Sequence, residues 1–515
     1  MRTLVTLLLA AGLTATATPA VLAEPEGPGC PTPRLRVPGA QHQEVACLAD
    51  LTTAGTTRTG HTDPADWAGL TQEALPVPDP VPGVQVDGYF PDDSTTNTNH
   101  GWNHDAQFVL RLPENWNGGL VVSGTPGNRE QYANDRAISD WVLSEGYAFA
   151  ATDKGNTGVG FAADGDRPGD AIAEWNHRLT QLTRAAKAAT TRHYHRRPDP
   201  TLVTGLSNGG YLVRWQLENH PELYDGGVDW EGTLWSENGP NLVEYLPTAL
   251  SAYPRYADGG PGAAAAHAEL VAAGFPEGSE FLWEYHHEVY WGLTQRIYRE
   301  EIDPGFDGDD TDYDYRQRPV EVHEAVERIG LTGRIGKPLL TLHGTLDVLL
   351  PISEDSDVYA DMVREQARGD LHRYYRIEDG THTDSLVDAF PARLRALTPC
   401  HRTAFESLEG FLAEGTPLPP SATVPRPAKA TPEDLVTTCK LTGHGQSWRA
   451  RRYSASTSSR CGGVSPSTAC IMSPHVSMAI MRPVSGSVRA TNNSASALSH
   501  ATAAPRRSGR CSASA

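Results

Sequence analysis

The amino-acid sequence predicts an α/β fold: a mostly parallel, doubly wound sheet with a helical cap inserted before one of its last strands. Three observations lead to this prediction. Short apolar strands alternate with helix-forming segments between residues 119 and 230, residues 239–334 interrupt that rhythm, and a strand signal returns at residues 338–342. Alternating strands and helices are typical of a parallel sheet that is covered on both faces.

The N-terminal residues are expected to add little to the sheet. Arg2, an apolar run and a small-residue site ending at Ala23 have the three parts of a secretory signal peptide, so residues 1–23 are expected to be cleaved and the protein exported. Residues 24–80 are rich in Pro, Gly and Thr, which predicts an irregular N-terminal arm. No other segment has the 18 or more apolar residues that a membrane span needs.

The core is expected to comprise residues 81–238 and 335–439. Its first two strands alternate apolar and polar residues, and the later ones are continuously apolar. The expected strands are 84–89, 107–112, 119–123, 147–152, 201–206, 227–230, 338–342 and 373–377. The expected helices are 132–143 with Gly146 as its stop, an amphipathic helix containing Trp175, Leu179, Leu182, Ala186 and Ala189, one after Ser207, and those at 358–366, 386–397 and 404–412.

Residues 239–334 are too long for a loop and predict a helical cap, or lid. The segment holds much of the aromatic content of the chain, which would line an apolar substrate pocket. The alternative is a small helical core that buries its own aromatic rings.

The last segment, residues 440–515, differs sharply in composition. It has no Asp or Glu, nine Arg and one Lys, and it is dense in serine. Such a segment cannot build a core, so it is expected to be a disordered basic tail. The same composition is expected of a coding region that is read in the wrong frame.

The net charge bears on the class of binding partner, and the cysteine content bears on disulfide bonds. The formal net charge of −20, with no basic stripe, argues against a nucleic-acid partner. Seven cysteines in an exported chain predict disulfides, and the expected pairs are Cys30–Cys47 and Cys400–Cys439.

Ser207 is the expected nucleophile. It lies in Gly205-Leu206-Ser207-Asn208-Gly209, between a β-branched strand and a helix-forming run, which is the setting of a G-x-S-x-G nucleophile elbow. A serine hydroxyl needs a general base, and the base needs an acid that orients it. Both are expected downstream, the acid before the histidine.

The acid is expected to be Asp347 and the base His382, because each follows a strand at the edge where open α/β sheets bind their ligands. For the acid, Asp229 and Glu231 are alternatives after the preceding strand. Three other histidines are weaker candidates for the base. His372 starts a strand, His401 starts a helix, and His343 lies beside the acid. The oxyanion donors are expected to be the backbone amides of Asn208 and Thr125.

No cofactor is expected, although one acidic loop could hold a structural calcium ion in the cap. The loop contains Asp307, Asp309, Asp310, Asp312 and Asp314 but lacks EF-hand spacing, and a solvated acidic loop is the alternative. The histidines at 193, 195, 286 and 287 lack the companion ligands of a zinc site.

With these residues placed, residues 84–439 resemble an α/β-hydrolase of the group that contains 3-hydroxybutyrate oligomer hydrolases and tannase/feruloyl esterases. The resembling stretches are 146–158, the elbow 207–210, 223–228, and 333–338 through His343 and Asp347 to Pro351. The resemblance implies a lid between the same strands and hydrolysis of carboxylic esters through an acyl-enzyme.

One departure bears on the substrate. Many tannase-type enzymes have bridged cysteines beside the nucleophile and the histidine, whereas Leu206 and Thr383 stand here. This favours hydroxy-acid oligomers over aromatic-acid esters. The expected function is therefore a secreted serine esterase that acts on a small or oligomeric ester; a serine peptidase or amidase on the same fold, and a binding module with a decayed site, are the alternatives.

Overall fold

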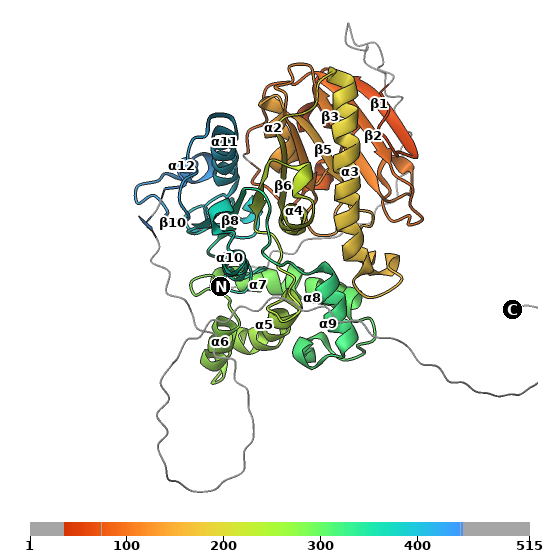
Figure 1. Cartoon of the computed structure of the whole chain (residues 1–515). Coiled ribbons are helices and arrows are strands. Elements are labelled where there is room, and N and C mark those ends of the chain that lie inside the picture. Colours follow the sequence, from red (N-terminus) through yellow and green to blue (C-terminus); the bar gives the residue numbers. More distant parts are fainter. Residues whose placement is uncertain (1–34, 74, 443, 446–515) are drawn as a thin grey trace, which may run out of the picture. The chain divides into compact units, whose positions relative to one another are not determined.

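The computed structural model describes residues 35–73, 75–442 and 444–445, which form one mixed sheet with helices on both faces (Figure 1). The spatial order of the eleven strands is β1-β2-β3-β5-β4-β6-β7-β8-β9-β10-β11. Their bounds are β1 His42–Leu48, β2 Gly83–Tyr89, β3 Gln107–Pro113, β4 Leu120–Gly124, β5 Ala148–Thr152, β6 Thr201–Leu206, β7 Gly226–Trp230, β8 Leu339–Gly344, β9 His372–Ile377, β10 Ala422–Val424 and β11 His444–Gly445.

The sheet changes from antiparallel to parallel along this order. The pairs β1–β2, β2–β3 and β3–β5 are antiparallel, and every pair from β5–β4 to β9–β10 is parallel. The last pair, β10–β11, is antiparallel again. The central strands are buried on both faces, as their apolar sequences predict, and the expected strands lie within two residues of the observed ones.

Two groups of helices cover the two faces. The helices α3 Asp170–Tyr194, α4 Asn208–Asn219 and α10 Ser356–Glu365 pack into one apolar cluster, and α2 Asp140–Ser144 and α11 Thr398–Glu414 pack into the other. The apolar residues that predicted α3 are all buried, which confirms that helix. Gly146 ends α2 with a φ of 86°, the left-handed conformation that glycine tolerates.

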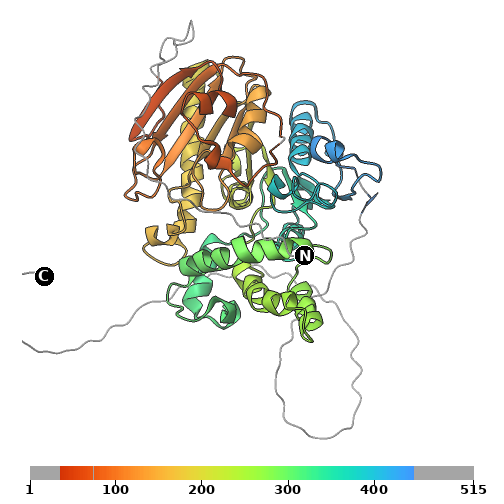
Figure 2. The same cartoon turned by 180° about the vertical axis from the view of Figure 1, so that it is seen from behind.

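The inserted segment is helical. It contains α5 Leu242–Ala257, α6 Ala263–Ala272, α7 Glu280–His286, α8 Gly292–Ile302 and α9 Val320–Ile329, with a π-turn at His287–Trp291 between α7 and α8. These helices are the green group in Figures 1 and 2. They contact the core directly, since α8 and α9 pack on α3 and the Tyr211 hydroxyl of α4 donates to the Ile329 carbonyl at 2.8 Å.

The N-terminal arm is more regular than expected. β1 pairs with β2 along all seven of its residues, and α1 Thr53–Arg58 follows it. The prediction of an irregular arm over residues 24–80 was therefore wrong for this part. Most side chains of β1 are only partly buried, so backbone pairing rather than an apolar pattern holds this edge strand.

The helix expected at residues 386–397 is also absent. The structure has a short 3-10 turn at Asp384–Leu386 and irregular backbone up to α11. Pro391 explains the difference, because proline removes a backbone donor and disfavours helical geometry at the residue before it. After α11, only α12 Pro432–Thr437 remains among the described helices.

One expected disulfide is confirmed. Cys400 and Cys439 are bonded, with their Cα atoms 4.9 Å apart, and tie α11 to the segment after α12. Cys30, the signal peptide at residues 1–23 and nearly all of the predicted tail lie outside the described residues. Within the described part of the chain, no helix combines the length and the apolar character that crossing a membrane requires.

Candidate active site

Ser207 lies on a sharp turn between β6 and α4. Its φ of 59° and ψ of −121° are strained for a residue with a side chain. The turn fits only because glycines flank it: a Cβ on Gly209 would lie 2.3 Å from the Gly124 carbonyl oxygen, and one on Gly205 would lie 2.5 Å from the backbone of Gly209. The sequence motif therefore corresponds to a real close approach of β4, β6 and α4.

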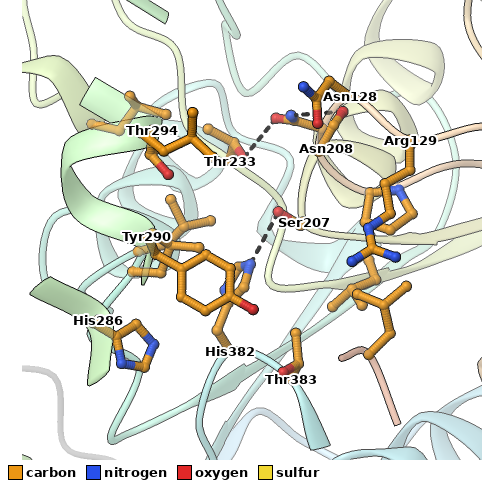
Figure 3. A pocket seen from close by; sticks show the side chains of 18 of the residues that line it. Asn128, Arg129, Ser207, Asn208, Thr233, His286, Tyr290, Thr294, His382 and Thr383 are labelled. Atoms are coloured by element: carbon orange, nitrogen blue, oxygen red, sulfur yellow. Dashed lines mark hydrogen bonds between the residues drawn. The ribbon is translucent and has the colours of Figure 1, made fainter. Parts of the chain in front are cut away.

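His382 and Asp347 meet Ser207 at the same edge of the sheet. His382 Nε2 lies 3.0 Å from Ser207 Oγ (Figure 3). On the other side of the ring, His382 Nδ1 lies 2.8 Å from Asp347 Oδ2. Asp347 is on the loop after β8 and His382 on the loop after β9, so parallel strands bring both to one end of the sheet. The chain has the α/β-hydrolase fold. Its strand order, its elbow and the Ser-Asp-His order along the chain are those of this fold.

Asp347 is held as an anion. It is fully buried, and its Oδ1 accepts hydrogen bonds from the amides of Leu349 and Leu350 at 2.8 and 2.9 Å. Burial would raise the pKa of this carboxyl, but the charge of His382 and hydrogen bonds from His343 and His382 outweigh it and hold the pKa well below its usual range.

His382 is a stronger base than an ordinary histidine. Burial would lower its pKa, but the charge and hydrogen bond of Asp347 outweigh this effect and raise it. Glu231 Oε2 lies 3.4 Å from the same nitrogen, Nδ1, that faces Asp347. Glu231, an alternative acid from the sequence, thus reaches the histidine too, whereas Asp229 pairs with Arg214 away from it.

The rejected histidines lie elsewhere, with one exception. His372 contacts Thr341, and His401 contacts Thr204, in the interior of the sheet. His343 is fully buried beside the acid, with Nε2 3.2 Å from Asp347 Oδ2 and Nδ1 2.7 Å from Ser356 Oγ. It therefore contacts the same carboxylate oxygen, Asp347 Oδ2, that faces His382.

The expected oxyanion donors lie on α4 and on the loop after β4. Asn208 is the first residue of α4, where an amide has no acceptor within the helix. Thr125 is buried, and its hydroxyl is held by Lys154 Nζ at 2.5 Å and the Arg129 carbonyl at 3.0 Å. Burial lowers the pKa of Lys154 to about 7, and this lysine, which the sequence analysis did not single out, braces the loop.

A cavity of about 230 Å³ opens above Ser207. Its lining is mostly apolar and comes from both the core and the cap. Leu206 and Thr383, the two positions that replace bridged cysteines, both belong to it. Of the cap aromatics, Tyr285, Tyr290 and Tyr298 line the cavity. Others pack within the cap, as the fully buried Trp283 does edge-on against Tyr256, which fits the alternative of a helical core that buries its own rings.

Two polar groups in this cavity were missed by the sequence analysis. Arg129 is its only arginine or lysine, and no carboxylate belongs to the lining. In the view of Figure 3, Arg129 lies on the opposite side of Ser207 from Tyr290 and His286. His286 Nδ1 faces the Leu282 carbonyl at 2.9 Å and must donate to it, so Nε2 is left as an acceptor. Burial lowers the pKa of His286 to about 4, which keeps it neutral.

The acidic loop of the cap, considered above as one that could hold calcium, is not among the groups of described residues whose ligand atoms converge. Asp309 and Asp314 accept from backbone amides of their own turns, and Asp310 pairs with Arg299. Among the described residues, two other groups bring three ligand atoms within 4.8 Å of one another: Glu231 with Asp347 and His382, and the partly exposed Asp92, Asp93 and Asp164.

Comparison with known families confirms the resemblance inferred from sequence. Residues 94–230 match the family model described as tannase and feruloyl esterase, and residues 306–447 match that of the 3HB-oligomer hydrolases. The chain is 30% identical over 141 residues to mono(2-hydroxyethyl) terephthalate hydrolase of Piscinibacter sakaiensis, and 31% over 112 residues to D-(-)-3-hydroxybutyrate oligomer hydrolase of Azoarcus sp. strain BH72. These matches cover 25% and 20% of this chain, and 23% and 16% of the two relatives.

Two solved structures align with most of this chain at TM-scores below 0.5. Feruloyl esterase B from Aspergillus oryzae aligns with 77% of this chain and 92% of its own, at a TM-score of 0.49 and 13% identity. Tannin acyl hydrolase from Aspergillus niger aligns with 73% of this chain and 83% of its own, at a TM-score of 0.42 and 13% identity.

Proposed function

We propose that the protein is a secreted serine esterase that cleaves carboxylic esters through an acyl-enzyme. The observation that carries the proposal is the hydrogen-bonded series Ser207, His382 and Asp347 at the floor of a largely apolar cavity. The disulfide Cys400–Cys439 supports export, because disulfides persist in oxidising compartments.

The mechanism follows from the positions of these groups. His382 Nε2 takes the proton of Ser207 Oγ as this oxygen attacks the ester carbonyl, while Asp347 stabilises the imidazolium through Nδ1. The amides of Asn208 and Thr125 stabilise the oxyanion. His382 then gives the proton to the departing alkoxide, and water, activated by the same base, releases the acid and restores Ser207.

The cavity favours a substrate with a free carboxylate. Arg129 is anchored by the carbonyls of Asp66 and Ala68 at 3.3 and 2.8 Å, and no acidic group lines the cavity with it. A monoester of terephthalate and an oligomer of 3-hydroxybutyrate, which the names of the relatives mention, each keep such a group. Oligomers of small hydroxy acids are our preferred substrate class, since Leu206 and Thr383 replace the bridged cysteines.

Replacement of the nucleophile tests the proposal. Ser207→Ala should lower kcat/KM on 4-nitrophenyl butyrate by at least ~10³-fold, because no other group supplies the acyl-enzyme step. A serine-directed phosphonate should label Ser207 in the wild type and nothing in the variant. Unchanged ester hydrolysis by Ser207→Ala would refute the mechanism, and faster cleavage of a matched anilide than of the ester would replace the esterase by an amidase.

A further inference from the structure

Glu231 places a second carboxylate against the imidazole of His382. It is the first residue after β7, and its backbone amide donates to the Leu342 carbonyl of β8 at 2.9 Å. Its φ of 51° is unusual for a residue with a side chain. Strain of this kind clusters at functional sites, and here it accompanies a side chain aimed at the reacting groups.

The two oxygens of Glu231 are used differently. Oε1 accepts from the Gly344 amide at 2.6 Å, which fixes the carboxyl between β7 and β8. Oε2 is buried, lies 3.4 Å from His382 Nδ1, and has no hydrogen-bond partner among the described residues. Asp347 Oδ2, in contrast, contacts both His382 and His343. An oxygen without a partner is costly in the interior when it is charged.

Two ionised carboxylates at Nδ1 would also work against the proposed reaction. They would hold His382 as an imidazolium, which cannot take the proton of Ser207. The site avoids this if Glu231 keeps its proton. Burial and the charge of Asp347 raise the pKa of Glu231 to about 8, which agrees with a neutral Glu231 beside an ionised Asp347.

We propose that Glu231 is a reserve acid of this site: protonated, it leaves His382 to Asp347, and it ionises and replaces Asp347 as the partner of Nδ1 when the charge at position 347 is removed. This proposal rests on the proposed esterase function. In Asp347→Asn, Glu231 releases its proton to solvent and its carboxylate accepts the Nδ1 hydrogen of His382. Ser207 Oγ then still gives its proton to Nε2.

A double-mutant comparison tests this role on the full-length protein with 4-nitrophenyl butyrate. Removing the charge of a triad acid typically costs ~10⁴-fold in kcat. We expect Asp347→Asn to lose only ~10²-fold in kcat/KM relative to wild type, and the double variant to lose ~10⁴-fold relative to Glu231→Gln, its parent variant. Glu218→Gln, which alters a half-buried glutamate that accepts from the amides of Thr332 and Gly333 instead, serves as the control and should leave the loss of Asp347→Asn unchanged.

The pH profile separates this role from a structural one. Only an ionised Glu231 stabilises the imidazolium in Asp347→Asn, so the ascending limb of kcat/KM should lie at least ~1 pH unit higher in this variant than in Asp347→Asn/Glu231→Gln. The proposal would be overturned if Asp347→Asn lowered kcat/KM by the same factor in wild type and in Glu231→Gln. It would also be overturned if the ascending limbs of the two pH profiles coincided. If the double variant does not fold, Asp347→Asn/Glu231→Asp, which withdraws the carboxylate, must show the same ~10⁴-fold loss. Failure of Ser207→Ala to abolish activity would instead refute the esterase mechanism itself.

Discussion

Arg129 illustrates how a single residue sets the chemistry of an otherwise apolar cavity. The carbonyls of Asp66 and Ala68 hold its guanidinium without neutralising its charge. A guanidinium has five donors in a fixed plane, so some remain for a substrate. The protein carries a formal net charge of −20, so a local cation in the cavity wall is where an anionic substrate end would gain most.

Arg129→Gln should therefore affect binding more than chemistry. A hydrogen bond to a charged group contributes about 1.5–3 kcal/mol, so KM for the 3-hydroxybutyrate dimer should rise at least ~10-fold with little change in kcat. The methyl ester of the same dimer, which lacks the carboxylate, should be hydrolysed equally well by both proteins. The exposed Arg255, which pairs with Glu269, offers a control in Arg255→Gln. Equal KM changes for both substrates would exclude a carboxylate contact.

The residues proposed to react and the residues that line the cavity differ in how far the sequence could predict their positions. Ser207, Asp347 and His382 follow strands, and parallel strands deliver their ends to one edge, so a motif and chain order sufficed to name them. Arg129 and His286 lie on a loop and on a cap helix with no motif. Their meeting depends on how the cap packs on the core, which no local pattern encodes.

Helices and strands with a clear hydrophobic periodicity were predicted correctly, and those without one were not. The apolar strands β4 to β9 and the helix α3 were predicted because burial on one or two faces leaves a clear periodicity. β1 was missed because its side chains are only partly buried, and backbone pairing leaves no trace in the sequence. The helix predicted at residues 386–397 is absent because Pro391 lies inside it, where proline removes a backbone donor and disfavours helical geometry.

The turn between β6 and α4 requires glycine at the positions that flank Ser207, because a side chain there would contact neighbouring backbone atoms. Gly209→Ala would place a Cβ 2.3 Å from the Gly124 carbonyl oxygen, so α4 and β4 would have to separate. We expect a loss of about 1–3 kcal/mol in the free energy of unfolding and a large loss of esterase activity, because Ser207 moves with the turn. Gly260→Ala, in a cap loop with no atom within 4 Å of the new Cβ, is the control. Urea denaturation of both variants checks this, and equal stability would contradict the close approach.

Over the whole molecule, buried ionisable groups couple stability to pH. A carboxyl whose pKa is raised on folding keeps its proton where the unfolded chain has lost it, so it stabilises the fold less as pH rises towards the folded pKa. Glu301 has a pKa raised from 4.5 to about 8 by burial. His343, whose pKa is raised to about 9, acts in the same direction: the unfolded chain loses this proton near pH 6.5 while the folded protein keeps it, so the stabilisation decreases as pH rises towards 9. Histidines such as His372, whose pKa is lowered to about 3, are neutral in both states above pH 6.5.

The free energy of unfolding should consequently fall between pH 7 and pH 9. The contribution of Glu301 to this decrease can be measured with a variant. Glu301→Gln is neutral at every pH and keeps an oxygen that can accept from the Ile172 amide, so its curve should fall by about 1 kcal/mol less over this range than that of wild type. Glu300→Gln removes the same charge from the adjacent, exposed position and should run parallel to wild type. Urea denaturation at several pH values gives the three curves. A Glu301→Gln curve parallel to the other two would mean that Glu301 is already ionised in the folded protein at pH 7, and that its contact with the Ile172 amide outweighs the cost of burying its charge.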